Sequence, residues 1–407
     1  MLDPRFIRDN VDEVKKSVRA RGKKVNVDKL IKLYDERNQV LQQVEEMRSE
    51  TNFKGKPSPE ALKKLQKAKD KKTELEKELQ KVEKHLNQLL LQVPNLIDPS
   101  TPIGDESNNA VLRVVGEPTE ITDAKDHIEL GQKLNLLDFE RGAKVAGSKF
   151  YFLKNQLVEL EMALVNYAFD VMKQEGFELM TVPHMVNERT FIGTGFLAKG
   201  EESNTYETKD GMTLIASAEY PLTGYHTDEI LTSDDLPRLY TAFSPSYRLE
   251  AGSYGKHAHG LFRVHQFDKV EMYVYCRPKE SNEWFDRLLG ISERIYQDLE
   301  VPYRVTQVAS GDMGSKNYKQ YDLEYYSPVD SEYRELTSCS NVTDFQSRRL
   351  MMRYRGGDGK PEYLHTLNNT AVAISRTLIA LLENHQTSDG HIKIPKVLHG
   401  HLTFTSI

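Results

Sequence analysis

The stretch SYRLEAGSYGKHAHGLFRVHQFDKVEMY, residues 246–273, reads as two strands joined by a glycine-rich, basic loop. By the same alternation that governs any strand, Arg248 and Glu250 share one face of the first strand. Antiparallel pairing brings this strand beside the second, where one face carries Arg263, His265, Phe267, Lys269, Glu271 and Tyr273. Cations, an aromatic ring and carboxylates together suit phosphate, a stacked base, and an amine or hydroxyl. A pair of salt-bridged surface strands is the alternative.

Three histidines lie in or beside the loop, at His257, His259 and His265. Alternating histidines can share a metal ion, but such a site needs further ligands and supporting partners. No cysteine or acidic cluster lies nearby in the sequence. We therefore expect partly charged loop histidines rather than a zinc site.

Length and composition are those of an ordinary globular protein. The 407 residues suggest two or three domains, and a net charge of −6 excludes a uniformly basic nucleic-acid binder but not a basic element. No apolar run approaches the ~20 residues of a membrane span, and the N-terminus lacks the apolar core of a secretory signal. The two cysteines, Cys276 and Cys339, form no CxxC motif. We expect a cytoplasmic protein that does not enter a membrane.

The N-terminal third predicts helices only. Residues 3–21 form an amphipathic pattern that Asp3-Pro4 opens and Gly22 stops. Two heptad runs follow, at about 28–50 and 65–93, and the segment NFKGKPSP joins them. This pattern predicts an antiparallel coiled-coil hairpin at about 28–93. It could serve as a dimerisation or spacer coil.

Lysine dominates the far half of this hairpin, where Glu60 and Asp70 are the local acids. Such a basic element on an acidic protein suits binding to a phosphate backbone, although a solvated charged face would look the same. The candidate nucleic-acid contacts are Lys63, Lys64, Lys67, Lys69, Lys71 and Lys72.

Beyond the turn-rich linker at 94–109 the pattern becomes α+β. Helices are expected at 154–175, 281–299 and 369–384, and strands at 177–186, 213–220, 238–248 and 262–275. Strands that mostly follow one another predict an antiparallel sheet flanked by helices.

Two further elements carry chemistry. Glu335 and Ser338 are suitable oxygen ligands for Mg²⁺, which completes its shell with phosphate and water. Arg376 is the lone basic residue of an otherwise apolar helix. It either binds an anion or forms a buried ion pair.

The order of SYRLEAGSYG, FRVHQFDKVEMY, ELTSCSN and LNNTAVAISRTLIALLENHQ resembles the second and third signature motifs of class II aminoacyl-tRNA synthetases. The basic-tipped hairpin narrows the resemblance to the seryl-tRNA synthetase family. The resemblance implies a helical tRNA-binding arm within residues 1–105 and a catalytic domain at 106–407. It also implies a homodimer formed through the first signature motif of class II synthetases, which here includes the helix before Pro183. The implied substrates are ATP, L-serine and tRNA(Ser), and the implied cofactor is Mg²⁺. A further candidate substrate is tRNA(Sec).

The resemblance also implies roles for individual residues. Arg248, Glu271 and Arg376 would be catalytic, with the two arginines on the ATP phosphates, and Glu335 and Ser338 would hold Mg²⁺. The ATP site would comprise Arg248, Leu249, Glu250, Val264, Phe267, Glu335, Leu336, Thr337, Ser338 and Arg376. The serine pocket would comprise Ser217, Ala218, Glu219, Glu271, Asn368 and Thr370.

Two positions depart from the family pattern. Ser217 replaces the usual threonine of a Thr-Ala-Glu triplet, and His257-Ala258-His259 replaces an acidic residue, a small residue and an arginine. Two other functions remain open: a related enzyme that charges a carrier protein, and a non-catalytic coiled-coil RNA-binding or scaffold dimer. Relatives of the first kind tend to lack the arm. The second would lose residues such as Arg248 or Arg376, and both are present.

Overall fold

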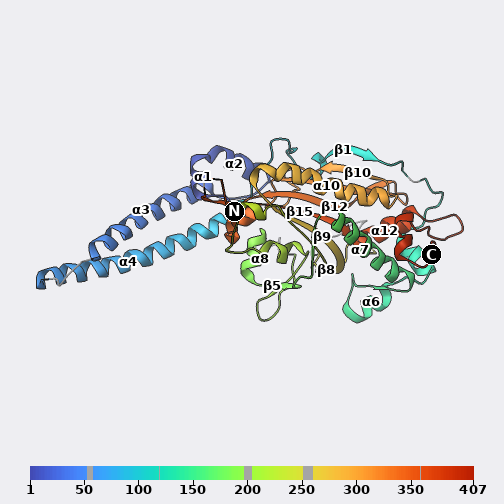
Figure 1. Cartoon of the computed structure of the whole chain (residues 1–407), viewed down its shortest axis with the longest axis horizontal. Helices are drawn as coiled ribbons and strands as arrows, with labels where there is room; N and C mark the ends of the chain where they lie inside the picture. Colours follow the sequence, from blue (N-terminus) through green and yellow to red (C-terminus); the bar gives the residue numbers. More distant parts are fainter. Residues whose placement is uncertain (53–57, 119, 197–203, 251–259, 358) are drawn as a thin grey trace. The chain divides into compact units, whose positions relative to one another are not determined.

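The computed structural model describes residues 1–52, 58–118, 120–196, 204–250, 260–357 and 359–407 (Figure 1). The chain divides into two compact units, Met1–Leu96 and Ile97–Ile407. The turn-rich linker crosses this division. Its later part packs with the second unit, where the Asp98 N–H donates to the Tyr318 carbonyl and the Ser310 N–H donates to the Pro102 carbonyl.

The described part of the first unit is helical. Its helices are α1 (Pro4–Asp9), α2 (Val11–Ala20), α3 (Val27–Thr51) and α4 (Pro59–Leu90). The single helix predicted over residues 3–21 is therefore two helices, because Asn10 leaves the helical conformation with φ −129°. The Asp3 side chain caps α1 by accepting hydrogen bonds from the Arg5 and Phe6 N–H groups, and Gly22 ends α2 with φ +63°.

The predicted antiparallel hairpin is confirmed. Ion pairs Arg37–Glu83 and Arg48–Glu76 join α3 to α4, and their numbers run in opposite directions along the two helices. Val40, Val44 and Leu75 form a buried cluster between the helices. Helix α4 ends at Leu90 rather than at the predicted Val93. The next residues close a tight turn in which the Val93 N–H donates to the Leu90 carbonyl.

The second unit contains, within its described residues, an eight-stranded sheet with the order β1-β10-β11-β12-β15-β9-β8-β4. Neighbouring strands are antiparallel except β4 and β8, which are parallel. This confirms the predicted fold class. The strands are β1 (Ala110–Val115), β10 (Tyr303–Gln307), β11 (Lys319–Ser327), β12 (Glu332–Thr343), β15 (His365–Ala373), β9 (Gln266–Cys276), β8 (Arg238–Tyr247) and β4 (Glu178–Met180).

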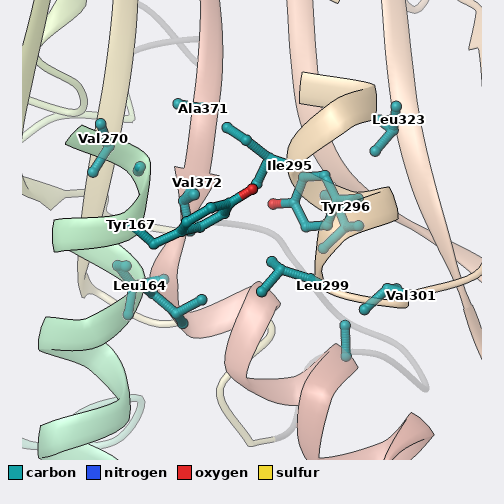
Figure 2. Close-up of a cluster of buried hydrophobic side chains, with 14 of the residues drawn as sticks. Leu164, Tyr167, Val270, Ile295, Tyr296, Leu299, Val301, Leu323, Ala371 and Val372 are labelled. Atoms are coloured by element: carbon teal, nitrogen blue, oxygen red, sulfur yellow. The ribbon is translucent and has the colours of Figure 1, made fainter. Parts of the chain in front are cut away.

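Helices α7 (Gln156–Gln174), α10 (Ser281–Asp298) and α12 (Ile374–Asn384) contribute to the main core against this sheet. Figure 2 shows Leu164 and Tyr167 of α7 meeting Val270 of β9 and Val372 of β15. A second cluster joins Tyr240, Tyr273 and Tyr275 of the sheet to Leu222 and Leu350. The latter two belong to α9 (Glu219–Gly224) and α11 (Phe345–Leu350).

Smaller elements complete the second unit. They are α5 (His127–Lys133), α6 (Phe139–Ala146), α8 (Glu188–Thr194), β2 (Leu137–Asp138), β3 (Phe152–Leu153), β5 (Met185–Val186), β6 (Thr213–Leu214), β7 (Ile230–Leu231), β13 (Arg353–Arg355) and β14 (Pro361–Tyr363), with 3₁₀ turns at Glu106–Asn108, Ser233–Asp235, Pro278–Glu280 and Lys396–His401. Across the described residues, no helix is both long enough and apolar enough to span a bilayer.

Several predicted boundaries were wrong. The helix predicted at 369–384 begins only at Ile374, since its first residues belong to β15. The strand predicted at 213–220 ends at Leu214, and Glu219 begins a helix. The strand predicted at 177–186 is two short strands, because Pro183 has no N–H to donate to a ladder.

Candidate active site

The register of the central strands gathers the predicted site residues on one face of the sheet. Thr370 of β15 pairs with Glu271 of β9, and Asn368 pairs with Tyr273. Along β9, the alternate side chains of Val270 and Met272 enter the main core on the opposite face. The alternation predicted for this strand therefore holds from Phe267 to Tyr273.

One end of the site is a buried acidic pocket around Glu271, whose side chain is only 3% exposed. The Thr370 hydroxyl donates to Glu271 Oε2 at 3.2 Å, and Lys269 Nζ lies 3.3 Å from the same oxygen. Burial raises the pKa of Glu271 and lowers the pKa of Lys269, and their ion pair opposes both shifts. A carboxylate held in this way is a strong acceptor for an ammonium or hydroxyl group.

A second buried carboxylate, Glu219, lies in the first turn of α9. Its Oε1 accepts hydrogen bonds from Gln346 Nε2 at 2.9 Å and Asn368 Nδ2 at 3.3 Å, and pairs with Lys316 Nζ. The Ser217 hydroxyl accepts a hydrogen bond from the Glu219 N–H at 3.2 Å. The Ser-Ala-Glu triplet thus forms a buried turn that presents its carboxylate to the face that carries Asn368 and Thr370.

The other end of the site is basic and aromatic. The Arg248 guanidinium lies over the Phe267 ring, 5.0 Å from its centroid. Arg248 follows β8 directly, and its backbone is held by His265: the Arg248 N–H donates to the His265 carbonyl, and His265 Nδ1 lies 3.0 Å from the Arg248 carbonyl. The predicted strand over residues 262–275 begins only at Gln266, so Arg263 and His265 are not strand residues.

Alternation predicted that Glu250 shares a strand face with Arg248, but in the structure it does not. Its φ of +45° takes the chain out of the extended conformation after β8 ends. Its carboxylate instead lies 3.5 Å from the Arg263 guanidinium, and Lys149 Nζ donates to its carbonyl.

Arg376, in the first turn of α12, pairs with Glu335 of β12, with 3.0 Å between NH1 and Oε1. The same guanidinium lies 4.7 Å from the Phe262 ring centroid. The Arg376 side chain is 18% exposed and that of Glu335 is 46% exposed, so the pair is not a closed core contact. Arg376 lowers the pKa of Glu335, with help from Arg248 and Lys269, against the opposing effect of burial.

Asp322 adds a second carboxyl group beside Glu335. It lies on β11 directly opposite Ser338 of β12. Burial and the negative charge of Glu335 raise the pKa of Asp322 well above its usual range, and a hydrogen bond with Ser338 opposes that rise. Two carboxylates and a hydroxyl are a suitable oxygen donor set for Mg²⁺, which commonly takes one or two carboxylates and completes its shell with phosphate oxygens and water.

The remaining predicted residues have varied surroundings. Val264, Leu336 and Thr337 are buried, so their side chains point away from solvent, whereas Leu249 is exposed. The arm lysines all lie on α4, and Lys72 is the half-buried member of the group, 3.8 Å from Glu76. His257 and His259 lie outside the described residues. Among the residues that are described, no cluster of three or more His, Cys, Asp or Glu side chains could hold a metal ion.

The structure also brings in side chains to which the sequence gave no role. Lys269 was placed on the correct face but without a function, and Asp322, Lys316 and Gln346 were not singled out. Gln346 and Lys316 lie 127 and 97 residues from Glu219 along the chain. Only the folded topology shows that they meet it.

Comparison with known proteins follows the same division of the chain. Residues 202–385 match the family model described as the tRNA synthetase class II core domain (G, H, P, S and T). With its largely antiparallel sheet and its arginine- and carboxylate-lined face, the second unit is thus a class II aminoacyl-tRNA synthetase core. Residues 1–97 match the model of the seryl-tRNA synthetase N-terminal domain.

Full-length relatives agree with both matches. Serine–tRNA ligases of Rubrobacter xylanophilus and Treponema denticola are each 42% identical to this chain, over 98% and 100% of its length and 97% and 100% of theirs. A crystal structure of seryl-tRNA synthetase from Pyrococcus horikoshii, complexed with ATP, superposes with a TM-score of 0.93 at 38% identity, covering 100% of this chain and 99% of that one. A cytoplasmic serine–tRNA ligase of Naegleria fowleri in complex with AMP gives 0.89 at 34%, covering 100% and 98%. The chain belongs to the seryl-tRNA synthetase family.

Proposed function

We propose that the protein activates L-serine with ATP to form seryl-adenylate and then transfers serine to the 3′ end of tRNA(Ser). The observation that carries this proposal is the continuity of the site across one sheet face. Two buried carboxylates, Glu219 and Glu271, each paired with a lysine, lie at one end. The arginines Arg248 and Arg376 lie at the other end. Relatives that match the full chain are named serine–tRNA ligases.

In the first step, the serine carboxylate oxygen attacks the α-phosphorus of ATP, and the bond from that phosphorus to the bridging oxygen of pyrophosphate breaks. Arg248 would contact the α-phosphate and the serine carboxylate, and Arg376 the far phosphate. Their charges would matter most as the leaving pyrophosphate gains negative charge. No protein nucleophile is needed, because positioning and electrostatics lower the barrier.

At the other end of the site, Glu219 would accept from the serine ammonium, and Glu271 with Thr370 would bind the serine hydroxyl. In the second step, a ribose hydroxyl of the tRNA 3′ end attacks the seryl carbonyl carbon. The acyl–phosphate bond breaks, and AMP leaves. The lysine-rich part of α4 would contact the tRNA backbone.

Glu335 and Ser338, together with Asp322, would hold Mg²⁺, and the donor set described above fits that ion. When bound, Mg²⁺ would neutralise charge on the ATP phosphates. Arg376, which pairs with Glu335, would contact the far phosphate. The ATP-bound relative supports ATP as the nucleotide substrate.

A homodimer formed through the helix before Pro183 is supported by exposed apolar side chains. Val158 and Met162 of α7 and Leu179 of β4 are each more than a third exposed. Large apolar side chains gathered at a surface favour association with a partner. Two buried free thiols, Cys276 and Cys339, fit the reducing environment of the cytoplasm, where we propose that the enzyme acts.

The test is amino-acid-dependent ATP–pyrophosphate exchange with each of the twenty amino acids. Serine should be the only good substrate. Alanine should be rejected by roughly 10⁴-fold, since it leaves the buried Glu271 and Thr370 without their hydroxyl partner. Threonine must be rejected sterically and therefore less strongly. Exchange with alanine within tenfold of serine would rule out this pocket. Aminoacylation of tRNA(Ser) and tRNA(Sec) transcripts would then define the acceptor.

A further inference from the structure

The side-chain partners of Glu219 among the described residues all lie on one of its two carboxylate oxygens. Lys316, Gln346 and Asn368 each contact Oε1. Within the described residues, no contact to Oε2 is found. The carboxylate is therefore held from one side, and its second oxygen is left to a ligand.

Lys316 is built into this position. Its segment lies between β10 and β11, and the residue is 9% exposed. Its ammonium also lies 5.1 Å from the centroid of the Phe196 ring, which adds a cation–π contact. A buried lysine with a carboxylate and an aromatic partner is a fixed positive charge rather than a surface side chain.

The pocket consequently contains two buried ion pairs, Lys316–Glu219 and Lys269–Glu271, and its four charges sum to zero. The pairs also act on each other, since both Glu219 and Lys316 influence the ionisation of Glu271. Arg248 adds positive charge at the nucleotide end and acts on Lys269.

We propose that Lys316 is a specificity-determining residue: by neutralising Glu219, it makes the amino-acid pocket select a zwitterionic amino acid over a cationic amine that lacks a carboxylate. The proposal rests on the proposed function and deepens it. Serine brings a positive and a negative charge into a balanced pocket, so that its carboxylate can meet Arg248. An amine without a carboxylate would add an uncompensated positive charge, which a low-dielectric site penalises.

Loss of the Lys316 charge should reverse this preference. The pocket would then hold one more negative than positive charge, and a simple cation would restore the balance. Ethanolamine is a suitable probe because it keeps the ammonium and hydroxyl of serine and lacks the carboxylate. The quantity to measure is the ratio of the ethanolamine inhibition constant to the serine KM in ATP–pyrophosphate exchange.

In Lys316→Met, this ratio should fall at least about tenfold relative to the wild type, because the cation gains more than the zwitterion from the added negative charge. Lys316→Arg keeps the charge and should keep the ratio. Lys319→Met is the matched control, since Lys319 also lies over aromatic rings, those of Phe285 and Tyr321, but is not paired with Glu219. It should not change the ratio.

A ratio for Lys316→Met within threefold of the wild-type value overturns the proposal. If Lys316→Met does not fold, the proposal is tested on the wild type by comparing its ethanolamine inhibition constant with its serine KM. An ethanolamine inhibition constant at least tenfold above the serine KM supports the proposal, and one within threefold of it overturns the proposal. Failure of the proposed function would look different: the wild type would then show no serine-dependent exchange at all.

Discussion

Replacement of Arg376 by alanine tests whether this arginine acts on ATP or only holds the fold together. In the structure, Arg376 pairs with Glu335 at 3.0 Å and covers the Phe262 ring. Its guanidinium is partly exposed on the site face of the second unit. Two roles are therefore compatible with its position: a structural ion pair and a phosphate ligand.

The two roles predict different magnitudes. Charge-assisted hydrogen bonds to phosphate are worth roughly 1.5–3 kcal/mol, which corresponds to a loss of about tenfold to 150-fold in the rate of adenylate formation. The structural contribution should be small. Glu335 is half exposed, so the ion pair adds about 0–1 kcal/mol, and the cation–π contact adds about 0.5–1 kcal/mol. The unfolding temperature should therefore fall by only a few degrees, at roughly 2–4 °C per kcal/mol of lost stability.

The assay is serine-dependent ATP–pyrophosphate exchange, measured beside thermal unfolding followed by circular dichroism. Arg287→Ala is the matched control. Arg287 also pairs with a glutamate, Glu175, and also lies over an aromatic ring, that of Trp284 at 4.8 Å, but on α10, which packs on the face of the sheet opposite the site. It should lose a similar small amount of stability with exchange unchanged.

Two results would contradict this reasoning. If Arg376→Ala is unfolded at room temperature, the residue is a structural ion pair of much greater importance than its exposure suggests. If the variant is folded and exchanges pyrophosphate within threefold of the wild type, Arg376 does not bind the reacting phosphates. Equal losses of exchange in Arg287→Ala and Arg376→Ala would point to a general effect on the fold.

Three further predictions concern other parts of the chain. Replacing residues 28–93 with a short Gly/Ser linker should preserve exchange within a few-fold and abolish aminoacylation, and full aminoacylation by the armless protein would refute the arm's role. Glu335→Gln should raise the Mg²⁺ concentration needed for half-maximal exchange at least tenfold without changing the serine KM; an unchanged requirement would remove Glu335 from the metal site. Burial and a hydrogen bond to Asp268 raise the pKa of Glu161 from 4.5 to about 8, so its stabilising contribution is lost as pH rises through about 8. Glu161→Gln should therefore gain thermal stability relative to the wild type between about pH 5 and pH 9, and parallel curves would contradict this.

Sequence alone was sufficient for elements whose environment is asymmetric. The heptads of α3 and α4 alternate between a buried seam and solvent, so the hairpin could be predicted. Strand β9 keeps its alternation from Phe267 onward because its two faces differ chemically: one carries site residues and the other enters the core.

Prediction failed where a strand is buried on both faces and its two faces do not differ in charge. In β15 the residues from Thr366 to Ala373 are all buried, so the strand reads as a continuous run that periodicity cannot distinguish from a helix. Ser217 and Glu219 were assigned to a strand for a similar reason, since Ile215 and Ala216 before them are buried too. Contacts between distant segments, such as Lys316 with Glu219, have no local signal at all.

Several residues of the candidate site share one property: each is a charged or polar side chain where the local pattern calls for an apolar one. Glu271 and Lys269 lie in the middle of an apolar strand, and Thr370 and Asn368 lie in another. Burying such groups costs free energy unless they are paired. A chain therefore keeps them where pairing and function coincide, and we propose that here the pairs themselves are the recognition groups. The partners, however, come from whichever segment the fold brings near. That is why Glu271 could be predicted from its strand, whereas Lys316 could be recognised only once the fold had brought it to Glu219.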